Sequence, residues 1–314
     1  MEDLKTVTVL LSTYNGEHYL KQLLDSLLVQ KGVRVDIIVR DDGSTDHTRQ
    51  ILSDYKGQSG IQVYLGENIG WRDSFMTLLA SVAKEASSDY YAFADQDDIY
   101  ASDKFLAAVT KLAPHESQPA LYHSNVTLAD GDGHAIGDRY PRNFQPTGHL
   151  PEAFFDVTWL GTTMVFNRRL MALLAEHVPI DNIVHDAYVM NVAQFLGTVV
   201  YDPTPHMLYR RHDSAVTGFG GKSDSQKIKA PSLLDRYRRY KHNPVIHPFS
   251  KRAHELLVGY SDQLLPDQRR FLTAVATYRT NFRARLDLLF NPGIRASKLR
   301  PTLQIRYRVL ANTL

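Results

Sequence analysis

The chain has 314 residues, 43% of them hydrophobic, which suffices for one large domain or for a domain with an appendage. It has no cysteine, and this excludes disulfides, thiolate metal sites and a cysteine nucleophile. Residues 220–314 contain 19 Lys and Arg against 6 Asp and Glu, a net charge of +13, so residues 1–219 carry −11 within a total of +2. The acidic part fits a metal-assisted site. The basic part fits an anionic partner such as phospholipid head groups, or else is a solvated face.

No apolar run approaches the roughly 20 residues that a membrane-spanning helix needs. The first residues show no signal peptide, because Met1 to Lys5 is short and charged. We therefore expect a cytoplasmic protein, with a peripheral contact at the inner face of the plasma membrane as the role of its basic part.

The first elements alternate between strands and helices, and two of the strands end in polar loops. A strand over residues 6–11 leads into Ser12-Thr13-Tyr14-Asn15-Gly16, and an apolar stripe predicts a helix over 17–30. A strand over 35–40 leads into Asp41-Asp42-Gly43-Ser44-Thr45-Asp46, before a helix over 47–55. The second loop also has a simpler explanation as a turn and helix N-cap, which leaves Asp41 and Asp42 free.

A third strand, over residues 90–94, leads into Asp95-Gln96-Asp97-Asp98. Helices are predicted on either side of it, over 73–86 and 104–112. Carboxylates so close together repel one another unless a cation or strong donors hold them. One aspartate can bind a divalent metal while its neighbour binds sugar hydroxyls or waters. The alternative is an Asp-rich turn that caps the following helix.

The pattern continues with a strand over 120–128, a polar loop over 141–151 that could border an acceptor cleft, and a strand over 159–167. Helices over 168–177 and 185–196 and a short strand over 198–201 follow. This alternation predicts an α/β fold whose sheet has helices on both faces. In such sheets ligands gather at the carboxyl ends of the strands.

Residues 218–231 are rich in Gly, Ser and Lys and could act as a lid over a bound ligand. Helices are predicted beyond them over 233–240, 254–265 and 267–290. In residues 299–310, basic side chains alternate with large apolar ones. If this segment is a helix, it resembles an interfacial membrane segment; if it is a strand, it is an ordinary half-buried edge strand. We thus expect a catalytic domain over 1–218 and a basic, mainly helical extension over 219–314.

Four motifs in the first hundred residues carry a family resemblance. They are Val9 to Glu17, Asp41 to Asp46, Asn68-Ile69-Gly70, and Ala94 to Tyr100. In this order they resemble the inverting glycosyltransferases of family 2, which have the GT-A fold. Farther along, Trp159 to Asn167, His185-Asp186 and Tyr209-Arg210-Arg211-His212 resemble the bacterial polysaccharide branch, notably its rhamnosyltransferases. The chain departs from the family at Tyr100, where tryptophan is usual, and at Arg211-His212-Asp213-Ser214, where a Gln-His-Gly-Asn type segment is usual.

The resemblance implies a divalent metal, Mg or Mn, which neutralises the charge on a departing nucleoside diphosphate. It makes Asp98 the first choice for a metal ligand, with His212 at the position of the family's late histidine. Asp97 is then directed toward the ribose or the donor sugar. From its neighbours alone, His212 would be assigned to the surface.

Asp186 matches the acidic residue that family members use as general base. A carboxylate in the first turn of a helix, stabilised by the helix dipole, is the alternative. Where relatives often have an acidic residue before the base, this chain has His185.

The remaining assignments concern the nucleotide. Tyr14 resembles the residue that stacks on the pyrimidine, Ser12 lies near the base, and Asp42 matches the carboxylate that accepts the ring N3 proton. Asp41 is expected to brace the loop, and the Arg72 guanidinium suits the diphosphate. Gly161 permits the backbone to approach closely near the donor sugar or acceptor.

The resemblance as a whole implies transfer of a hexose, with rhamnose from its dTDP form the leading candidate, onto a bacterial cell-surface or exopolysaccharide precursor. The acceptor would be a saccharide or a polyprenyl-diphosphate-linked glycan, and no nucleic acid is expected. The alternatives are another UDP- or dTDP-hexose transferase, a nucleotidyltransferase, and a noncatalytic nucleotide-sugar-binding module on the same fold. A nucleotidyltransferase would usually have a Gly-rich basic loop after the first strand, which residues 12–17 lack.

Overall fold

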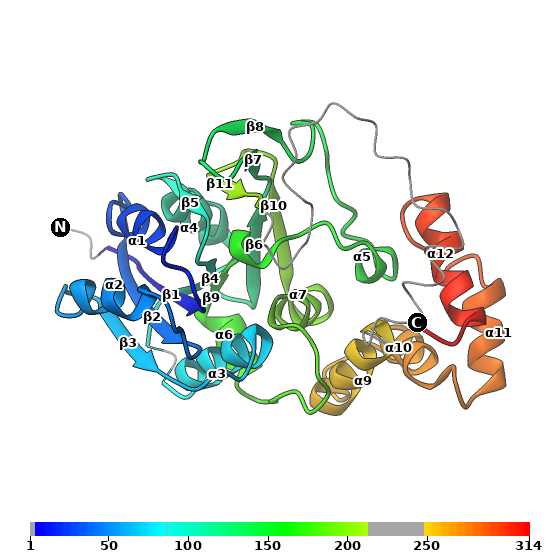
Figure 1. Ribbon diagram of the computed structural model, residues 1–314. Coiled ribbons are helices and arrows are strands. Elements are labelled where there is room, and N and C mark those ends of the chain that lie inside the picture. The colour runs from blue at the N-terminus through cyan, green and yellow to red at the C-terminus, as the bar shows by residue number, and fades with distance from the viewer. Residues whose placement is uncertain (1–3, 86, 213–247) are drawn as a thin grey trace.

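The computed structural model describes residues 4–85, 87–212 and 248–314. Its centre is a seven-stranded sheet in the order β10-β6-β9-β4-β1-β2-β3 (Figure 1). Strand β1 lies parallel to β2 and β4, β2 lies parallel to β3, and β9 is antiparallel to both of its neighbours. The strands are β1 (Thr6–Thr13), β2 (Arg34–Asp41), β3 (Ile61–Leu65), β4 (Tyr90–Asp95), β6 (Ala120–Ser124), β9 (Val165–Asn167) and β10 (Thr198–Asp202).

A four-stranded sheet in the order β5-β11-β7-β8 lies beside the larger one. It consists of β5 (Ile99–Tyr100), β11 (Met207–Arg210), β7 (Thr127–Ala129) and β8 (Ala135–Asp138). Because β5 follows directly on the Asp-rich motif and β11 directly precedes His212, this small sheet brings the two segments together.

Helices cover both faces of the large sheet. Successive side chains of a strand point to opposite faces, so Val9 and Leu11 of β1 join a core with α1, α2 and α4, whereas Leu10 joins the core of α3, α6 and α7. The helices of this part are α1 (Leu20–Leu28), α2 (Thr48–Tyr55), α3 (Trp71–Ala83), α4 (Lys104–Leu112), α5 (Glu152–Phe155), α6 (Arg168–Leu174) and α7 (His185–Leu196). The α/β class predicted from the sequence is confirmed.

Three predicted elements are wrong. Residues 159–167 are not one strand, because Gly161–Thr163 form a 3-10 turn that is closed by a hydrogen bond from Met164 N to Gly161 O. The helix predicted over 267–290 is two helices, because the side chain of Asn281 accepts a hydrogen bond from Ala284 N and so caps a new helix. Residues 120–128 likewise divide into β6 and β7.

The C-terminal helices α9 (Pro248–Tyr260), α10 (Pro266–Thr277), α11 (Phe282–Phe290) and α12 (Leu299–Leu310) form one end of the molecule (Figure 1). Phe249, Leu256 and Tyr260 of α9 belong to the same hydrophobic cluster as Leu173 of α6 and Tyr188 of α7. The predicted lid at 218–231, the helix at 233–240 and the domain boundary at 218 lie outside the described residues. Among the described residues, no helix has the length and hydrophobicity to cross a bilayer.

Candidate active site

The polar motifs meet at one edge of the sheet, as the sequence predicts. In the parallel register Thr13 of β1 lies opposite Asp41 of β2, and Ser12 lies opposite Asp95 of β4. Three strands therefore end side by side, and each of them is followed by its polar loop. This arrangement follows from the right-handed α/β connections, which bring parallel strands into register at their carboxyl ends.

The loop after β1 is attached to the Asp-rich motif through Gln96. The Gln96 side chain accepts a hydrogen bond from Tyr14 N (2.9 Å) and donates one to Tyr14 O (3.0 Å). A Cβ on Gly16 would lie 2.4 Å from Gln96 Oε1, so a larger residue there would displace the Gln96 amide from Tyr14. The Tyr14 ring remains 46% exposed and is available for stacking. No local pattern in the sequence indicates that Gln96 binds the backbone of Tyr14.

The carboxylates of the second loop are buried and engaged with the protein. Asp41 accepts hydrogen bonds from Ser44 N (3.1 Å) and Arg49 Nε (2.7 Å), which supports its assignment as a brace. Asp42 is paired with Arg40 and accepts hydrogen bonds from Ile69 N and Gly70 N, both at 2.9 Å. Because Asp42 is buried, a nucleobase could reach its carboxylate only after the groups that cover it have moved.

Ser12 and Arg72 lie on either side of the start of α3. The Ser12 hydroxyl is buried 2.6 Å from Ser74 Oγ, which also accepts a hydrogen bond from Arg40. Arg72 donates a hydrogen bond to Asn182 Oδ1 at 2.5 Å, so it reaches the loop before α7. In this arrangement the Arg72 guanidinium links two elements through one of its nitrogens, Nη1.

Asp98 is a structural residue here. It is 1% exposed, and its carboxylate accepts hydrogen bonds from Thr162 Oγ1 (2.8 Å) and Arg210 N (3.2 Å). The Tyr100 hydroxyl and the buried ammonium of Lys104 both bind Thr162 O, at 3.1 and 2.7 Å. Burial raises the pKa of Asp98 well above its usual range, and the charges of Asp97 and Asp95 raise it further. These contacts fix the 3-10 turn beneath the motif.

Asp97, and not Asp98, faces the late histidine. Asp97 Oδ2 lies 2.7 Å from His212 Nε2, and the backbone oxygen of Asp97 accepts a hydrogen bond from Arg210 Nε (2.8 Å). The His212 ring lies 4.8 Å from the ring of Tyr19. The structure therefore brings together a carboxylate and an imidazole as the sequence predicts, but with Asp97 in the place expected for Asp98.

The carboxylates at this edge are crowded. Burial, together with the negative charges of Asp97 and Asp186, raises the pKa of Asp95 to about 7. Such a site favours a cation, and oxygen ligands with one imidazole fit Mg or Mn. The residues present thus fit the divalent metal that the sequence implies.

Asp186 stands at the start of α7 against the 3-10 turn. A Cβ on Gly161 would lie 3.0 Å from Asp186 Cβ and 3.2 Å from His185 Nε2, so any larger residue there would push against these two side chains. Asp186 Oδ1 accepts a hydrogen bond from Ala187 N at 2.6 Å, and Oδ2 lies beside Gly161. The carboxylate is therefore fixed on a rigid helix at the edge where the other acidic groups gather.

His185 packs where relatives often have an acidic residue. Its ring stacks on Phe75 with the centroids 4.1 Å apart and meets Phe93 edge to face at 4.5 Å. Burial lowers the pKa of His185 to about 4, although the charge of Asp186 opposes this shift. His185 is thus a neutral packing residue at neutral pH.

Comparison with known proteins agrees with this geometry. The sequence profile of the family described as "Glycosyl transferase family 2" matches residues 8–155, which carry all the motifs of the first three strands. The chain is a glycosyltransferase with a family 2 domain over residues 8–155.

Relatives of this glycosyltransferase include glycosyltransferases from several bacteria. It is 28% identical to the dTDP-rhamnosyl transferase RfbG of Shigella flexneri over 220 residues, which cover 66% of this chain and 73% of RfbG. It is 29% identical to the glycosyltransferase GlyA of Streptococcus pneumoniae over 138 residues, which cover 43% of this chain but 19% of GlyA. The structure of S. aureus TarS 1–349 in complex with UDP-GlcNAc superimposes with a TM-score of 0.57 at 16% identity, over 98% of this chain and 82% of that one. This likeness identifies the fold as GT-A.

Helix α9 is bonded to the loop that leads into α7. The fully buried carboxylate of Glu255 accepts hydrogen bonds from Ile180 N (2.9 Å) and Asp181 N, and it lies 2.6 Å from His177 Nε2. Asp181, His254 and Glu255 bring three possible ligand atoms within 4.8 Å of one another, but the oxygens of Glu255 are already engaged. The loop that leads into α7, and hence to Asp186, is thereby tied to α9.

Arg252, one turn before Glu255, is the second buried charge of α9. It donates hydrogen bonds to Asn191 Oδ1 (2.7 Å) and Phe154 O (2.9 Å), and so joins α7 to α5. Burial lowers the pKa of Arg252 to about 10, which leaves it charged at neutral pH. The available signal in the sequence was an arginine within the apolar stripe of Phe249, Ala253 and Leu256.

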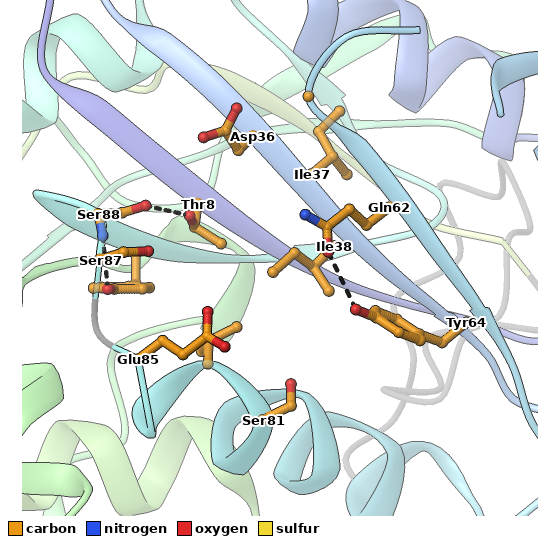
Figure 2. A pocket seen from close by; sticks show the side chains of 13 residues that line it. Thr8, Asp36, Ile37, Ile38, Gln62, Tyr64, Ser81, Glu85, Ser87 and Ser88 are labelled. Atoms are coloured by element: carbon orange, nitrogen blue, oxygen red, sulfur yellow. Dashed lines mark hydrogen bonds between the residues drawn. The ribbon is translucent and has the colours of Figure 1, made fainter. Parts of the chain in front are cut away.

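A cavity of 280 Å³ lies at a different edge of the sheet (Figure 2). Thr8, Asp36 and Gln62, from the first residues of β1 to β3, line it together with Glu85 after α3. The Thr8 hydroxyl is already engaged with Ser88 at 2.6 Å, as Figure 2 shows. Because the cavity is at the amino ends of the strands, it is separate from the carboxylates of the candidate active site.

Proposed function

We propose that this glycosyltransferase moves a hexose, rhamnose from dTDP-rhamnose in the leading case, onto a bacterial cell-surface or exopolysaccharide precursor with inversion at the anomeric carbon. The observation that carries the reaction is the placement of Asp186 on the rigid start of α7, against Gly161 and in the electrostatic field of Asp95. The choice of rhamnose is supported by the likeness to RfbG over two thirds of the chain.

The donor would be bound at the ends of β1 and β2. The exposed ring of Tyr14 suits stacking on a pyrimidine, whose binding in this way is typically worth about 1–3 kcal/mol. Ser12 and Asp42 lie below the surface next to Arg40, and they would serve the base after one of the backbone donors to Asp42 has moved.

Asp97 and His212 would hold a divalent metal, because their side chains already meet at 2.7 Å at the edge where the carboxylates gather. When bound, the metal supplies Lewis-acid neutralisation of the charge on the leaving diphosphate. Asp95 lies two residues before Asp97 on the same strand end, and it is placed to bind the ribose or the donor sugar.

In the transfer step the acceptor hydroxyl attacks the anomeric carbon from the face opposite the diphosphate. The new bond between carbon and oxygen forms as the bond to the diphosphate oxygen breaks, and the hydroxyl proton passes to a carboxylate oxygen of Asp186. Gly161 leaves space for the acceptor to approach this oxygen, and Arg252 and Glu255 keep α7 in position.

A panel of dTDP- and UDP-sugars tests the proposal, with binding measured by calorimetry and hydrolysis measured with and without Mn or Mg. Metal-dependent binding of dTDP-rhamnose above the other donors is the expected result. Preference for a UDP-sugar such as UDP-GlcNAc, the ligand in the TarS complex, would keep the reaction and change the donor. Binding without any turnover would instead favour a nucleotide-sugar-binding module.

We further propose that the acceptor is a polyprenyl-diphosphate-linked glycan. A peripheral contact with an anionic membrane would bring the enzyme close to such an acceptor. The basic charge of residues 220–314 motivates this contact.

A further inference from the structure

Helix α11 turns an apolar face away from the protein. Phe282, Leu286 and Phe290 follow one another at intervals of four residues, and their exposed fractions are 71%, 38% and 71%. Residues with this spacing lie on one face of a helix. On the opposite face, Ala284 and Leu288 are buried in the core. The helix is therefore anchored by one apolar face and presents a second one to its surroundings.

Helix α12 has the same organisation. Its buried side chains are Thr302, Ile305 and Val309. Its outward face carries large apolar side chains at helical spacing with exposed fractions of 75%, 57%, 48% and 67%, namely Leu299, Leu303, Tyr307 and Leu310. A surface helix of a globular protein normally has polar residues on this face. The two helices pack together at the end of the molecule in Figure 1.

The surroundings of these two faces are strongly basic. Residues 278–314 contain eight Lys and Arg and a single acidic residue, Asp287, a net charge of +7. Arg283, Lys298 and Arg300 are exposed next to the apolar side chains. A second copy of the chain would bring two such basic surfaces together, and their repulsion opposes such a pair. An anionic bilayer satisfies both features, because its acyl boundary accepts the apolar side chains and its head groups bind the cations.

We propose that the outward faces of α11 and α12 dock the glycosyltransferase on an anionic membrane surface. Segments next to this surface are bonded to the acceptor side, because Arg295 Nε lies 2.8 Å from Glu152 Oε1 and Ser297 N donates to Asp156 Oδ2 at 3.1 Å. Helix α5, which contains Glu152, precedes the turn at Gly161. Docking would thus hold the acceptor side near the membrane. That consequence rests on the proposed function with a lipid-linked acceptor, whereas the docking itself does not.

Vesicle sedimentation with the full-length protein tests the docking. Vesicles of phosphatidylglycerol and phosphatidylcholine in equal parts are compared with phosphatidylcholine alone, on which we expect little binding. The triple variant Phe282→Ser, Phe290→Ser, Leu303→Ser should lose about 100-fold or more in partitioning, because three large apolar side chains no longer insert. Replacing two cations, Arg283→Gln with Arg300→Gln, should cost about tenfold at low salt.

A matched control removes exposed apolar side chains from elsewhere, as Leu4→Ser, Val29→Ser and Ile136→Ser. It should bind vesicles like the wild type, and all variants should keep the wild-type melting temperature. Equal binding of the wild type and the Phe282 triple variant, or equal binding to both kinds of vesicle, would overturn the proposal. The proposal would also be overturned if the wild type binds no vesicles but forms an oligomer in sedimentation equilibrium, and the triple variant is a monomer.

Donor hydrolysis is measured on the same samples without vesicles. Its absence in the wild type would reject the proposed function, while the vesicle results would still decide the docking. Normal hydrolysis by a triple variant that no longer binds vesicles is the result expected if both are correct.

Discussion

Asp97 and Asp98 are adjacent in the sequence, but their carboxylates have different surroundings. Asp98 is buried against Thr162 and the backbone of Arg210, whereas Asp97 meets the imidazole of His212. A ligand for an exchangeable metal needs an accessible oxygen, so Asp97 replaces Asp98 in the proposed metal site. Asp98 instead connects the motif to the turn that borders Asp186.

The two aspartates should therefore respond differently to substitution. Asp97→Asn should weaken Mn binding by about 100-fold or more, since losing an outer-shell partner alone costs 10–100-fold. Asp98→Asn should keep Mn affinity within a few-fold but lower the free energy of unfolding by about 1–3 kcal/mol, because a buried hydrogen-bond acceptor is lost. Calorimetric titration with Mn and thermal melting measure both quantities. The reverse pattern would restore the assignment of Asp98 as the ligand.

Asp186→Asn should lower kcat by about 100- to 10,000-fold without weakening donor binding, because only the proton acceptor is removed. The amide oxygen of asparagine can still accept the hydrogen bond from Ala187 N, so the start of α7 should persist. Steady-state kinetics and calorimetry with the donor measure the two effects.

Asp73→Asn is the matched control, because Asp73 is also acidic and also in the first turn of a helix, α3. It should have nearly wild-type kcat. Equal loss of kcat in both variants would mean that Asp186 contributes only through the helix dipole.

At the scale of elements, α7 depends on α9, which follows it by more than fifty residues in the chain. Glu255 holds the backbone of residues 180 and 181, and Arg252 joins Asn191 of α7 to α5. Helix α7 is thus positioned by the buried charges of Arg252 and Glu255, which lie outside residues 8–155 that the family profile matches.

Glu255→Gln should lower both the melting temperature and kcat. An amide has one acceptor oxygen in place of two, so a backbone donor or His177 is left without its partner, at a cost of about 1–3 kcal/mol. His254→Gln is the control, since His254 is partly exposed and meets only Asp181, at 2.9 Å. A Glu255→Gln protein that melts and turns over like the wild type would show that α9 does not hold the loop.

The connection between β10 and β11 should make stability depend on pH. His206 lies 3.6 Å from Asp202 and 3.3 Å from Asp103, and these carboxylates, Asp202 foremost, raise the pKa of the imidazole. The folded state therefore favours the protonated ring. This contribution is fully present below the unfolded pKa, about 6.5, and is lost as the pH rises through the higher folded pKa.

The melting temperature of the wild type should exceed that of His206→Gln by most at about pH 5.5, and the difference should vanish toward about pH 9. Thermal melting at both pH values measures it. A difference that does not change with pH would assign the effect to packing.

At the scale of the whole molecule, the C-terminal helices and the sheet share one hydrophobic core. Leu256 and Tyr260 of α9 are buried in the same cluster as Tyr188 of α7 and Leu173 of α6. Among the described residues, the predicted helical extension is packed into this shared core. The membrane contact is therefore tested with surface substitutions and not with truncation.

Truncation after His212 should give an insoluble or molten protein. It removes α9 to α12, and each fully buried side chain such as Leu256 contributes about 1.5–3 kcal/mol, against a total stability of about 5–15 kcal/mol. Circular dichroism and solubility of the truncated chain measure the outcome. A truncated protein that unfolds cooperatively at the wild-type temperature would contradict a shared core.

Local patterns sufficed for the strands that carry the motifs and for most of the helices around them. Alternating or continuous apolar runs predict strands over 6–11, 35–40 and 90–94, and the observed strands extend these by only a few residues. They failed over 159–167, where apolar residues predict a strand but hydrogen bonds from Lys104 and Tyr100 fix a turn. The partners of that turn are about sixty residues away, so no local pattern contains them.

The sequence by itself determined which strand ends carry the chemistry, because parallel strands in an α/β sheet end at one edge whatever their loops contain. Only the tertiary structure decided which aspartate is accessible. Asp98 is buried by its hydrogen bonds with Thr162 and Arg210, which are 64 and 112 residues away in the chain. The pairing of β5 with β11 brings His212 next to Asp97. The tertiary structure also decided that Arg252 and Glu255 are buried and that Phe282 and Phe290 are exposed, since burial depends on which helix faces pack together and not on the composition of each helix.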